Sequence, residues 1–498
     1  MFTFVFFPKK SLPVFLCAAF FSVLCLHTSQ FLWGFEKHDL RRSIVSIKVK
    51  ATRAAYDNTG TWRGTGFLCD GKNGLIITNQ HVTGYGVVAT YEVTFFDGTK
   101  VSARLLYRDP WYDFAFLAVE ASETIPRQAR PLDYFTPAKQ GATVHMMGNN
   151  QGRDFSYQKG TITNLYNDVG FMPQPAFSTV LNSQGGSSGS PLVDDNGRVM
   201  GLNYGGSGRG QGFAIHSAVL GDALDALRAQ KKPPRFHCGF VVRLKSLSGV
   251  MRFHKFPSEV AKSYMRKDKK AKGRVLMVVG TLKGSPAEGV LQNGDVLWRV
   301  CGKEVGASAV TLEACLNASG GKPVVVEFYR KGVLLKKQIG TYDLHKTVVN
   351  RLLVFAGGTL FEADDHMRWQ FGVKPRQLMV RNVMPNSAFG RGLLPSFTNL
   401  SNEGRLSPVR LCLFTNQTFD SFLASIPKLV KQRAFDIQVR WLEEFNSGYS
   451  GVFFMTDAPD TCSIMYDNVH NTLPELITYA FNEKAWRTSA ILCHGDTL

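Results

Sequence analysis

The sequence predicts a mainly β protein that is divided into several domains. Three observations carry this prediction: the length of 498 residues, the 47 glycines, and many short apolar runs separated by Gly, Asn and Asp. A chain of this length exceeds one ordinary hydrophobic core, so two to four domains are expected. Short strands with turn signals between them, in a glycine-rich chain, are typical of sandwiches and barrels.

Residues 1–35 form a separate N-terminal segment. Two lysines precede an apolar run over residues 12–26, and no acidic residue occurs before Glu36. This pattern matches a signal peptide, a retained membrane anchor, or an organelle presequence. We therefore expect the secretory pathway or a membrane-anchored location, with a mitochondrial or other organelle lumen as the alternative.

The net charge of +19 is unevenly distributed, with nine Lys or Arg between positions 252 and 274 against two acidic residues. Such a run is typical of a solvated loop or helix face, and an anionic partner such as a membrane surface is the alternative. A nucleic-acid partner is not favoured, because the chain has neither an aromatic-interleaved basic repeat nor zinc-finger spacing. The cysteines are scattered and lack a C-x-x-C pair, so we expect neither a zinc site nor a disulfide framework. No metal and no organic cofactor is predicted.

The first domain is expected over residues 40–230. Its strand candidates are Ser43–Val49, Gly66–Cys69, Leu75–Thr78, Val93–Phe96, Phe114–Val119, Thr143–Met147 and Leu192–Val193. A helix is predicted at Ala218–Ala229, and residues 231–234, Lys-Lys-Pro-Pro, are a plausible linker.

Two further units of mixed α and β structure follow. The second, residues 235–345, has strand candidates Val275–Gly280 and Val296–Val300, a helix near Thr311–Asn317, and a hairpin that turns at Lys331 and Gly332. The third, residues 348–455, repeats part of this order weakly. Residues 456–498 give no domain signal and are treated as a C-terminal extension.

A small-residue turn at Gly185–Leu192 is the first candidate for chemistry. Peptide hydrolysis by a serine needs an exposed hydroxyl, an imidazole that takes its proton, a carboxylate that orients the imidazole, and N–H donors for the oxyanion. Glycines let the backbone turn sharply and place two N–H groups beside one hydroxyl. Alone, such a cluster is more often a flexible loop, but Pro191 and the apolar residues after it define the exit of the loop.

Two other residues supply the remaining groups. His81 follows the strand candidate Leu75–Thr78, and Asp113 opens an apolar run. A lone histidine in such a place is usually structural, and an acid at a strand start is usually a turn residue. From the residues alone, Asp109 is an equal contender for the acid.

Taken together, these segments resemble the HtrA/DegP family of serine proteases. The matching segments are Gly64–Phe67, Thr78–Val82, Asp113–Ala115, Gly186–Leu192 and Gly212–Ile215, in the chain order His, Asp, Ser. The resemblance covers about residues 44–227 and implies a trypsin-like double β-barrel. The G-S-S-G-S sequence at 186–190 resembles the eukaryotic branch, where the family more usually has G-N-S-G-G.

The resemblance assigns a role to each matching position. It implies that His81 is the general base, Asp113 the orienting acid and Ser188 the nucleophile. The N–H groups of Gly186 and Ser188 correspond to the oxyanion hole, and Phe213, Ala214 and Ile215 to substrate-binding residues.

Asn182 stands six residues before the nucleophile, at the base of the primary specificity pocket of trypsin-like barrels. Because it carries no charge, we expect no preference for Lys or Arg. Small or medium apolar side chains are the family-like expectation.

The downstream units resemble PDZ domains, so the fold class expected for the whole chain is a trypsin-like double β-barrel followed by two PDZ-like α+β domains. In the second unit, His237, Cys238, Gly239 and Phe240 correspond to the loop that binds a peptide's terminal carboxylate. Gly284–Ala287 and Leu291–Leu297 match the PDZ core. The third unit resembles a degenerate PDZ domain suited to structural or partner contacts.

The resemblance implies ATP-independent cleavage of misfolded or damaged proteins by a serine endopeptidase. Its partners would be polypeptide substrates, peptide C-termini at the PDZ unit, a membrane, and further copies of the chain, since the family often forms trimers. The alternative is a catalytically silent chaperone or PDZ scaffold.

Overall fold

The structure is a computed structural model of the chain. It describes residues 40–491 apart from 56–58, 168–175, 208, 268, 270–272, 382, 385, 394–410, 416, 448–449, 456–459, 466–473 and 481–484. The predicted N-terminal segment 1–35 lies outside the described residues. Within the described ranges, no helix is long and apolar enough to cross a bilayer.

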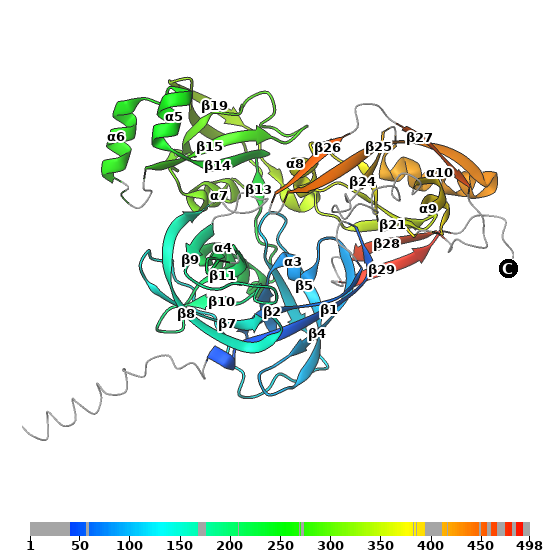
Figure 1. Cartoon of the computed structure of the whole chain (residues 1–498), viewed down its shortest axis with the longest axis horizontal. Coiled ribbons are helices and arrows are strands. Elements are labelled where there is room, and N and C mark those ends of the chain that lie inside the picture. The colour runs from blue at the N-terminus through cyan, green and yellow to red at the C-terminus, as the bar shows by residue number, and fades with distance from the viewer. Residues whose placement is uncertain are drawn as a thin grey trace, which may run out of the picture.

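Two closed six-stranded β-barrels form the first domain, as the sequence predicts (Figure 1). The first barrel has the strand order β1-β2-β3-β6-β5-β4 and the second β10-β11-β12-β9-β8-β7. The strands of the first are β1 Ile44–Ala54, β2 Gly60–Asp70, β3 Leu75–Thr78, β4 Val87–Thr94, β5 Lys100–Arg108 and β6 Ala115–Val119. Those of the second are β7 Thr143–Asn150, β8 Arg153–Asn167, β9 Ala176–Thr179, β10 Pro191–Val193, β11 Val199–Gly206 and β12 Gly212–His216.

Alternating side chains explain why these segments pair as barrel strands. In β1, Val45, Ile47 and Val49 are buried in the interior of the first barrel, while Lys48 and Lys50 point outward. Their partners on β2 include glycines, since Val45 lies opposite Gly66 and Ile47 opposite Gly64. Side chains at alternate positions reach one face of a strand, so the apolar set fills the barrel without leaving a polar group inside.

The described part of the second unit contains a six-stranded antiparallel sheet, a separate two-stranded sheet and the helices α5, α6 and α7. After helix α4, Ser217–Arg228, the chain enters β13, Phe236–His237, which pairs with β20, Tyr342–Asp343. The main sheet contains β14 Phe240–Ser246, β15 Arg274–Thr281, β16 Val296–Val300, β17 Lys303–Glu304, β18 Val324–Arg330 and β19 Val333–Ile339. Helix α7, Ala309–Ala318, contacts β13 and β16. The hairpin β18–β19 turns at Lys331 and Gly332, which both have positive φ, as expected for a two-residue turn.

The basic run at 252–274 includes parts of two helices, α5 Leu247–His254 and α6 Ser258–Lys267. Their apolar side chains pack with Trp298 and Tyr329 of the sheet, and the lysines and arginines of both helices are exposed. This is the solvated helix face that the charge pattern favours.

A disulfide joins Cys301 and Cys315, whose Cα atoms are 6.3 Å apart. The spacing of the cysteines in the sequence did not suggest this pair.

The third unit is built around a nine-stranded sheet that extends into the predicted C-terminal extension. It contains β21 Arg351–Phe355, β22 Gly358–Glu362, β23 Leu378–Arg381, β24 Leu411–Phe414, β25 Ala434–Ser447, β26 Ser450–Met455, β27 Asp460–Met465, β28 Glu475–Ala480 and β29 Ala485–Ala490. Its helices are α8 Asp365–Phe371, α9 Ala388–Leu393 and α10 Phe419–Gln432. Strand β27 pairs with β25, and β28 pairs with β21 at the start of the unit. The boundary expected at residue 455 therefore cuts through one sheet, because strands far apart in sequence pair within it.

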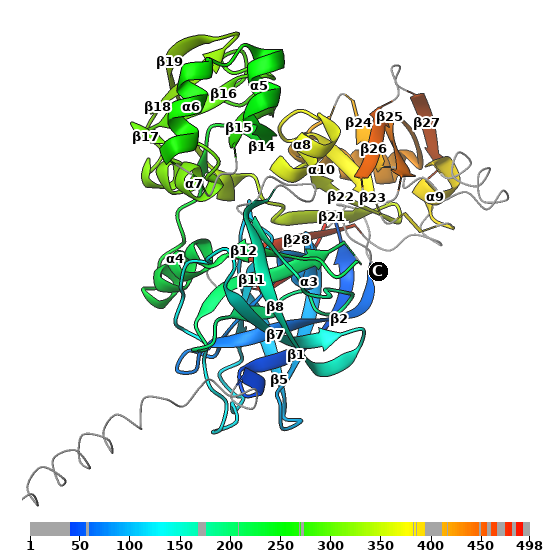
Figure 2. The same cartoon turned by 60° about the vertical axis from the view of Figure 1, so that its left-hand side comes forward.

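Both downstream units lie on the same side of the double barrel (Figures 1 and 2). The third unit contacts the first barrel, since the Tyr479 hydroxyl donates to the carbonyl of Leu105 at 2.9 Å and Arg108 donates to the carbonyl of Val349 at 3.1 Å. The second and third units meet where the Tyr342 hydroxyl donates to Asp365 at 2.7 Å. The units are therefore packed together by polar contacts as well as by apolar side chains.

Candidate active site

His81 and Asp113 form a two-point contact between the short helix α3, Gln80–Thr83, and the start of β6. The Nδ1 atom of His81 lies 2.6 Å from Oδ2 of Asp113, and the backbone N–H of His81 donates to Oδ1 at 2.8 Å. The side chain of Asp113 is 8% exposed and that of His81 is 37% exposed. The carboxylate thus holds one edge of the imidazole, and the ring remains accessible to solvent.

Asn79 forms a further hydrogen bond with Asp113. It is buried, and its side-chain amide donates to the carbonyl of Asp113 at 2.7 Å. In the sequence, Asn79 stands out only as part of the segment Thr78–Val82. Its position immediately before α3 is what lets it reach Asp113.

The loop that carries Ser188 is attached to the first barrel through Thr65 of β2. The N–H of Thr65 donates to the carbonyl of Ser188 at 2.9 Å, and the Thr65 hydroxyl donates to the carbonyl of Gly186 at 2.7 Å. The Thr78 hydroxyl donates to the carbonyl of Thr65 at 2.7 Å. Because Thr78 lies three residues before His81, these bonds bring the Ser188 loop to the strand end from which His81 projects.

Two glycines in this loop occupy places that a side chain could not. Gly186 has φ +91° and Gly189 has φ +89°, both in the left-handed region. A Cβ atom on Gly189 would lie 1.9 Å from the carbonyl oxygen of Thr65, and one on Gly186 would lie 2.2 Å from that of Asn149. The small-residue turn is therefore a tightly packed loop.

Asn203 of β11 supports the Ser188 loop from the second barrel. Nothing in the sequence singled out this residue. It is buried, and its side-chain amide donates to the Ser187 carbonyl and to the Ser183 hydroxyl, each at 3.0 Å. Its backbone exchanges hydrogen bonds of 2.9 Å with Gly189 and Ser190. Only the pairing of β11 with β10 reveals this role, because Asn203 lies fifteen residues after Ser188 in an ordinary strand pattern.

Asn182 is exposed and bonded to other amides. Its Oδ1 accepts from Gln184 at 3.0 Å, and its carbonyl accepts from Gln158 at 3.0 Å and from Asn150 at 3.2 Å. The side chains that form hydrogen bonds with Asn182 are therefore neutral amides.

Phe213, Ala214 and Ile215, which the resemblance assigns to substrate binding, are not exposed to solvent. All three are buried, and β12 is paired on both edges, with β11 on one side and β9 on the other. A strand with both edges paired has no free N–H or C=O groups for a substrate strand. The neighbouring strand β11 is longer than β10. Strand β10 begins at Pro191, which pairs with Leu202, and β11 continues beyond Leu202 to Gly206.

The predicted carboxylate-binding loop of the second unit is closed by its own histidine. Gly239, with φ +82°, donates its N–H to Nδ1 of His237 at 2.9 Å, and Cys238 and Phe240 are buried in the core. Burial lowers the pKa of His237 to about 3, so its ring is neutral and Nδ1 can accept this bond. One of the N–H groups that would receive a carboxylate is therefore engaged.

The same loop is packed against the first barrel. The rings of His237 and Trp111 have centroids 4.6 Å apart. Nearby, burial raises the pKa of Glu313 on α7 to about 7, although the Tyr112 hydroxyl and Arg235 oppose this rise. The loop that joins β5 to β6, residues 109–114, is thus in contact with the second unit.

Two six-stranded barrels, with the His81–Asp113 pair and the Ser188 loop held together where they meet, define a trypsin-like serine peptidase domain. A family model described as "Trypsin-like peptidase domain" matches residues 64–202, which include all three of these residues. The domain is similar in sequence to serine proteases of the HtrA/DegP family, in agreement with the resemblance of its motifs.

Several curated relatives match most of the chain. The pro-apoptotic serine protease NMA111 of Lodderomyces elongisporus is 28% identical over 345 residues, which is 67% of this chain and 35% of that protein. NMA111 of Chaetomium globosum is 30% identical over 70% of this chain and 34% of the relative. Protease Do-like 7 of Arabidopsis thaliana is 27% identical over 75% of this chain and 38% of the relative. The chain thus spans about a third of the length of these relatives.

Among solved structures, the HtrA-type protease AlgW with a tripeptide is 19% identical, with a TM-score of 0.44 over 62% of this chain and 96% of that one.

Proposed function

We propose that the chain is a serine endopeptidase that cleaves polypeptides through an acyl-enzyme on Ser188. The observation that carries this proposal is the contact between His81 and Asp113, in which both carboxylate oxygens accept bonds from one histidine. Two bonds fix the ring orientation and place the proton on Nδ1, which leaves Nε2 as the base. A histidine with a purely structural role has no need of this arrangement next to a glycine-rich serine loop.

In the proposed reaction, the Ser188 hydroxyl attacks the carbonyl carbon of the scissile peptide while Nε2 of His81 takes the hydroxyl proton. The imidazolium then gives this proton to the leaving amine, and a water molecule repeats the sequence to release the acyl group. Asp113 remains ionised and stabilises the imidazolium. The chemistry requires no ATP.

The oxyanion would be held by the N–H groups of Gly186 and Ser188. The carbonyl of Gly185 accepts from the N–H of Gln151 at 2.8 Å, which fixes the peptide unit that precedes Gly186. In a trans peptide the N–H points opposite to the C=O, so the Gly186 N–H is directed away from Gln151. A preorganised donor of this kind is worth about 100- to 1,000-fold in rate.

We further propose that the substrate adds as a strand along β11 beyond Leu202. The half-buried residues Tyr204, Gly205 and Gly206 follow Asn203, whose backbone is bonded to the Ser188 loop. This strand therefore leads directly from the nucleophile, and its two glycines allow close approach of another backbone.

Misfolded or damaged polypeptides are the proposed substrate class, because family resemblance and an uncharged pocket both suit extended, unselective apolar segments.

Strand β14 lies at one edge of its sheet in the described part of the second unit, so a peptide C-terminus could extend that sheet. Such binding would require His237 to release the N–H of Gly239. Assembly into trimers and association with a membrane through the exposed basic helices belong to the same proposal.

The specificity proposal makes a prediction for Asn182→Asp. A carboxylate at this exposed position should raise kcat/KM for substrates with Lys or Arg before the scissile bond about fivefold, because an exposed ion pair contributes on the order of 1 kcal/mol. Cleavage of a peptide library, read by mass spectrometry, measures the change. Asn182→Ala, which removes the amide without adding charge, should show no such gain. Identical cleavage profiles for Asn182→Asp and the wild type would exclude Asn182 from the pocket.

The endopeptidase proposal is tested by covalent labelling with a fluorophosphonate. We expect the intact chain to be labelled, and peptide mapping to find the adduct on Ser188. Absence of labelling from pH 6 to 9 would instead favour the silent chaperone or PDZ scaffold.

A further inference from the structure

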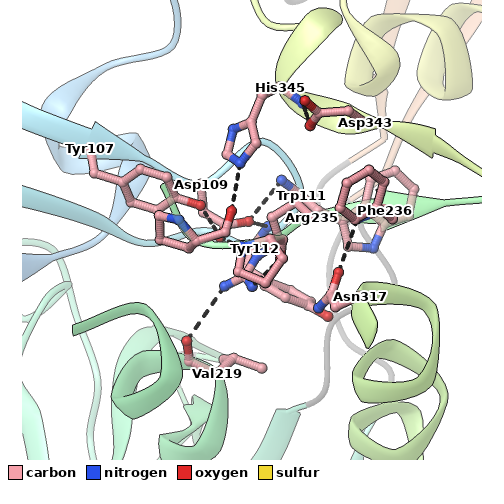
Figure 3. A network of polar contacts seen from close by, with 12 residues as sticks. Tyr107, Asp109, Trp111, Tyr112, Val219, Arg235, Phe236, Asn317, Asp343 and His345 are labelled. Carbon is pink, nitrogen blue, oxygen red and sulfur yellow. Dashed lines mark hydrogen bonds and ion pairs between the residues drawn. The ribbon is translucent and has the colours of Figure 1, made fainter. Parts of the chain in front are cut away.

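A buried ion pair joins the second unit to the loop that carries Asp113. Arg235, the residue before β13, donates from Nε to Oδ2 of Asp109 at 2.6 Å, and the two side chains are 4% and 0% exposed. Figure 3 shows the guanidinium between Asp109 of the first barrel and Val219 of α4, whose carbonyl accepts from Arg235 at 3.5 Å. The cation also lies 5.3 Å from the ring centre of Tyr112.

The Asp109 carboxylate organises the loop around itself. Oδ1 accepts the backbone N–H groups of Trp111 at 2.9 Å and Tyr112 at 2.8 Å, while Oδ2 accepts the Tyr107 hydroxyl at 2.9 Å as well as Arg235. An ionised carboxylate that is fully buried costs several kcal/mol unless it is paired and hydrogen-bonded throughout. Four donors, with Arg235 as the cation among them, meet this requirement.

This loop is short, and both ends of it are fixed. The N–H of Asp109 donates to the carbonyl of Phe114 at 3.1 Å, so Asp113 lies inside a closed turn. Asn79 and His81 hold the turn through hydrogen bonds to Asp113. Arg235 holds it through its bond to Asp109. A rotation of the Asp109 carboxylate would move the N–H groups of Trp111 and Tyr112, and with them the adjacent Asp113.

We infer that Arg235, although it lies outside the double barrel, is a positioning residue for the protease: through Asp109 it holds Asp113 in the geometry that orients His81. This inference rests on the proposed function. Arg235 touches neither substrate nor reacting atoms, and its effect is transmitted through the 109–114 turn. The second unit thereby supplies a residue that helps to hold the catalytic site together.

The test compares Arg235→Met with Arg330→Met in the full-length chain. Arg330 is the matched control, because it also pairs with a buried aspartate, Asp295, at 2.7 Å and donates to a backbone carbonyl, but it lies within the second unit away from the turn. For Arg235→Met we expect kcat on a peptide substrate to fall about 100-fold with little change in KM, as for a displaced catalytic group. The acid limb of the kcat/KM profile should move to lower pH, since a misplaced Asp113 stabilises the His81 imidazolium less. Arg330→Met should keep both values.

A second readout does not depend on turnover. The proton shared by His81 Nδ1 and Asp113 should give a low-field resonance in the NMR spectrum of the wild type, present in Arg330→Met and absent in Arg235→Met. If the wild type has this resonance and Arg235→Met loses it, the positioning role stands even if no activity is found and the proposed function fails. A folded Arg235→Met with unchanged kcat, pH profile and resonance would overturn the inference while leaving the proposed function intact. Should this variant not fold, the double variant D109N/R235M, which leaves neither charge buried alone, is read by the same three measurements.

Discussion

Ser188→Ala should abolish casein cleavage and fluorophosphonate labelling while the protein remains folded. Removal of a triad nucleophile lowers the rate by at least about 1,000-fold, since only substrate binding and the oxyanion donors then remain. The fold should survive because the loop is held by its backbone: the carbonyl of Ser188, not its hydroxyl, accepts from Thr65. Initial rates of casein hydrolysis, with circular dichroism to verify folding, give the comparison.

Ser190→Ala is the matched control for this prediction. Its hydroxyl lies two residues further along the same loop, is buried, and has no hydrogen-bond partner among the residues that the structure describes. Loss of an unpaired buried hydroxyl should not harm the protein and should leave cleavage near the wild-type rate. If Ser188→Ala retained more than about one-thousandth of the activity, the assignment of the nucleophile would be wrong.

Asp113→Asn should lower kcat about 10,000-fold with the fold intact. Both oxygens of Asp113 accept hydrogen bonds from His81, one from the backbone N–H and one from Nδ1–H. An asparagine has one oxygen and one NH₂ group, so one of these bonds must be lost or the imidazole must take the other tautomer, with its proton on Nε2 where the base is needed. Steady-state kinetics on a peptide substrate should show the loss in kcat and a small change in KM.

The second barrel offers a control of the same chemistry. Asp195 accepts from Nε2 of His145 at 2.8 Å, but its side chain is 68% exposed and the pair lies away from the Ser188 loop, between β7 and the turn after β10. Asp195→Asn should therefore leave kcat unchanged. Equal losses in the two variants would indicate a general effect of removing a histidine–aspartate pair, and would remove the special role of Asp113.

Individual strands were predictable from sequence where the signal is local. Short apolar segments such as Leu75–Thr78 in the first barrel and Val296–Val300 in the second unit have the bounds that their apolar residues suggest, and the hairpin of the second unit at Lys331 and Gly332 follows from turn chemistry. The division of the C-terminal part was not predictable in this way. Strand β28 pairs with β21 more than a hundred residues earlier, and no local signal encodes that partner.

The residues of the candidate site also fall into two groups, those found from short segments and those whose roles depend on long-range contacts. His81, Asp113 and Ser188 were identified because they lie in short segments that resemble the HtrA/DegP family, and only this resemblance separated Asp113 from Asp109. Thr65 and Asn203, which hold the serine loop, and Arg235, which holds Asp109, were not singled out as site residues. Their roles depend on hydrogen bonds to segments between 16 and 126 residues away.

By itself, the sequence determined the class of domain and the three residues proposed for catalysis, since short segments that resemble a known family carry both, and it determined the absence of charge at position 182. Only the tertiary structure showed that both edges of β12 are paired and that β11 extends beyond β10, which is the basis for our proposal that the substrate binds along β11. It also placed Arg235 of the second unit against Asp109, in the turn that carries Asp113. A buried carboxylate such as Asp109 is stable only when a cation meets it, and folding brings that cation from another domain.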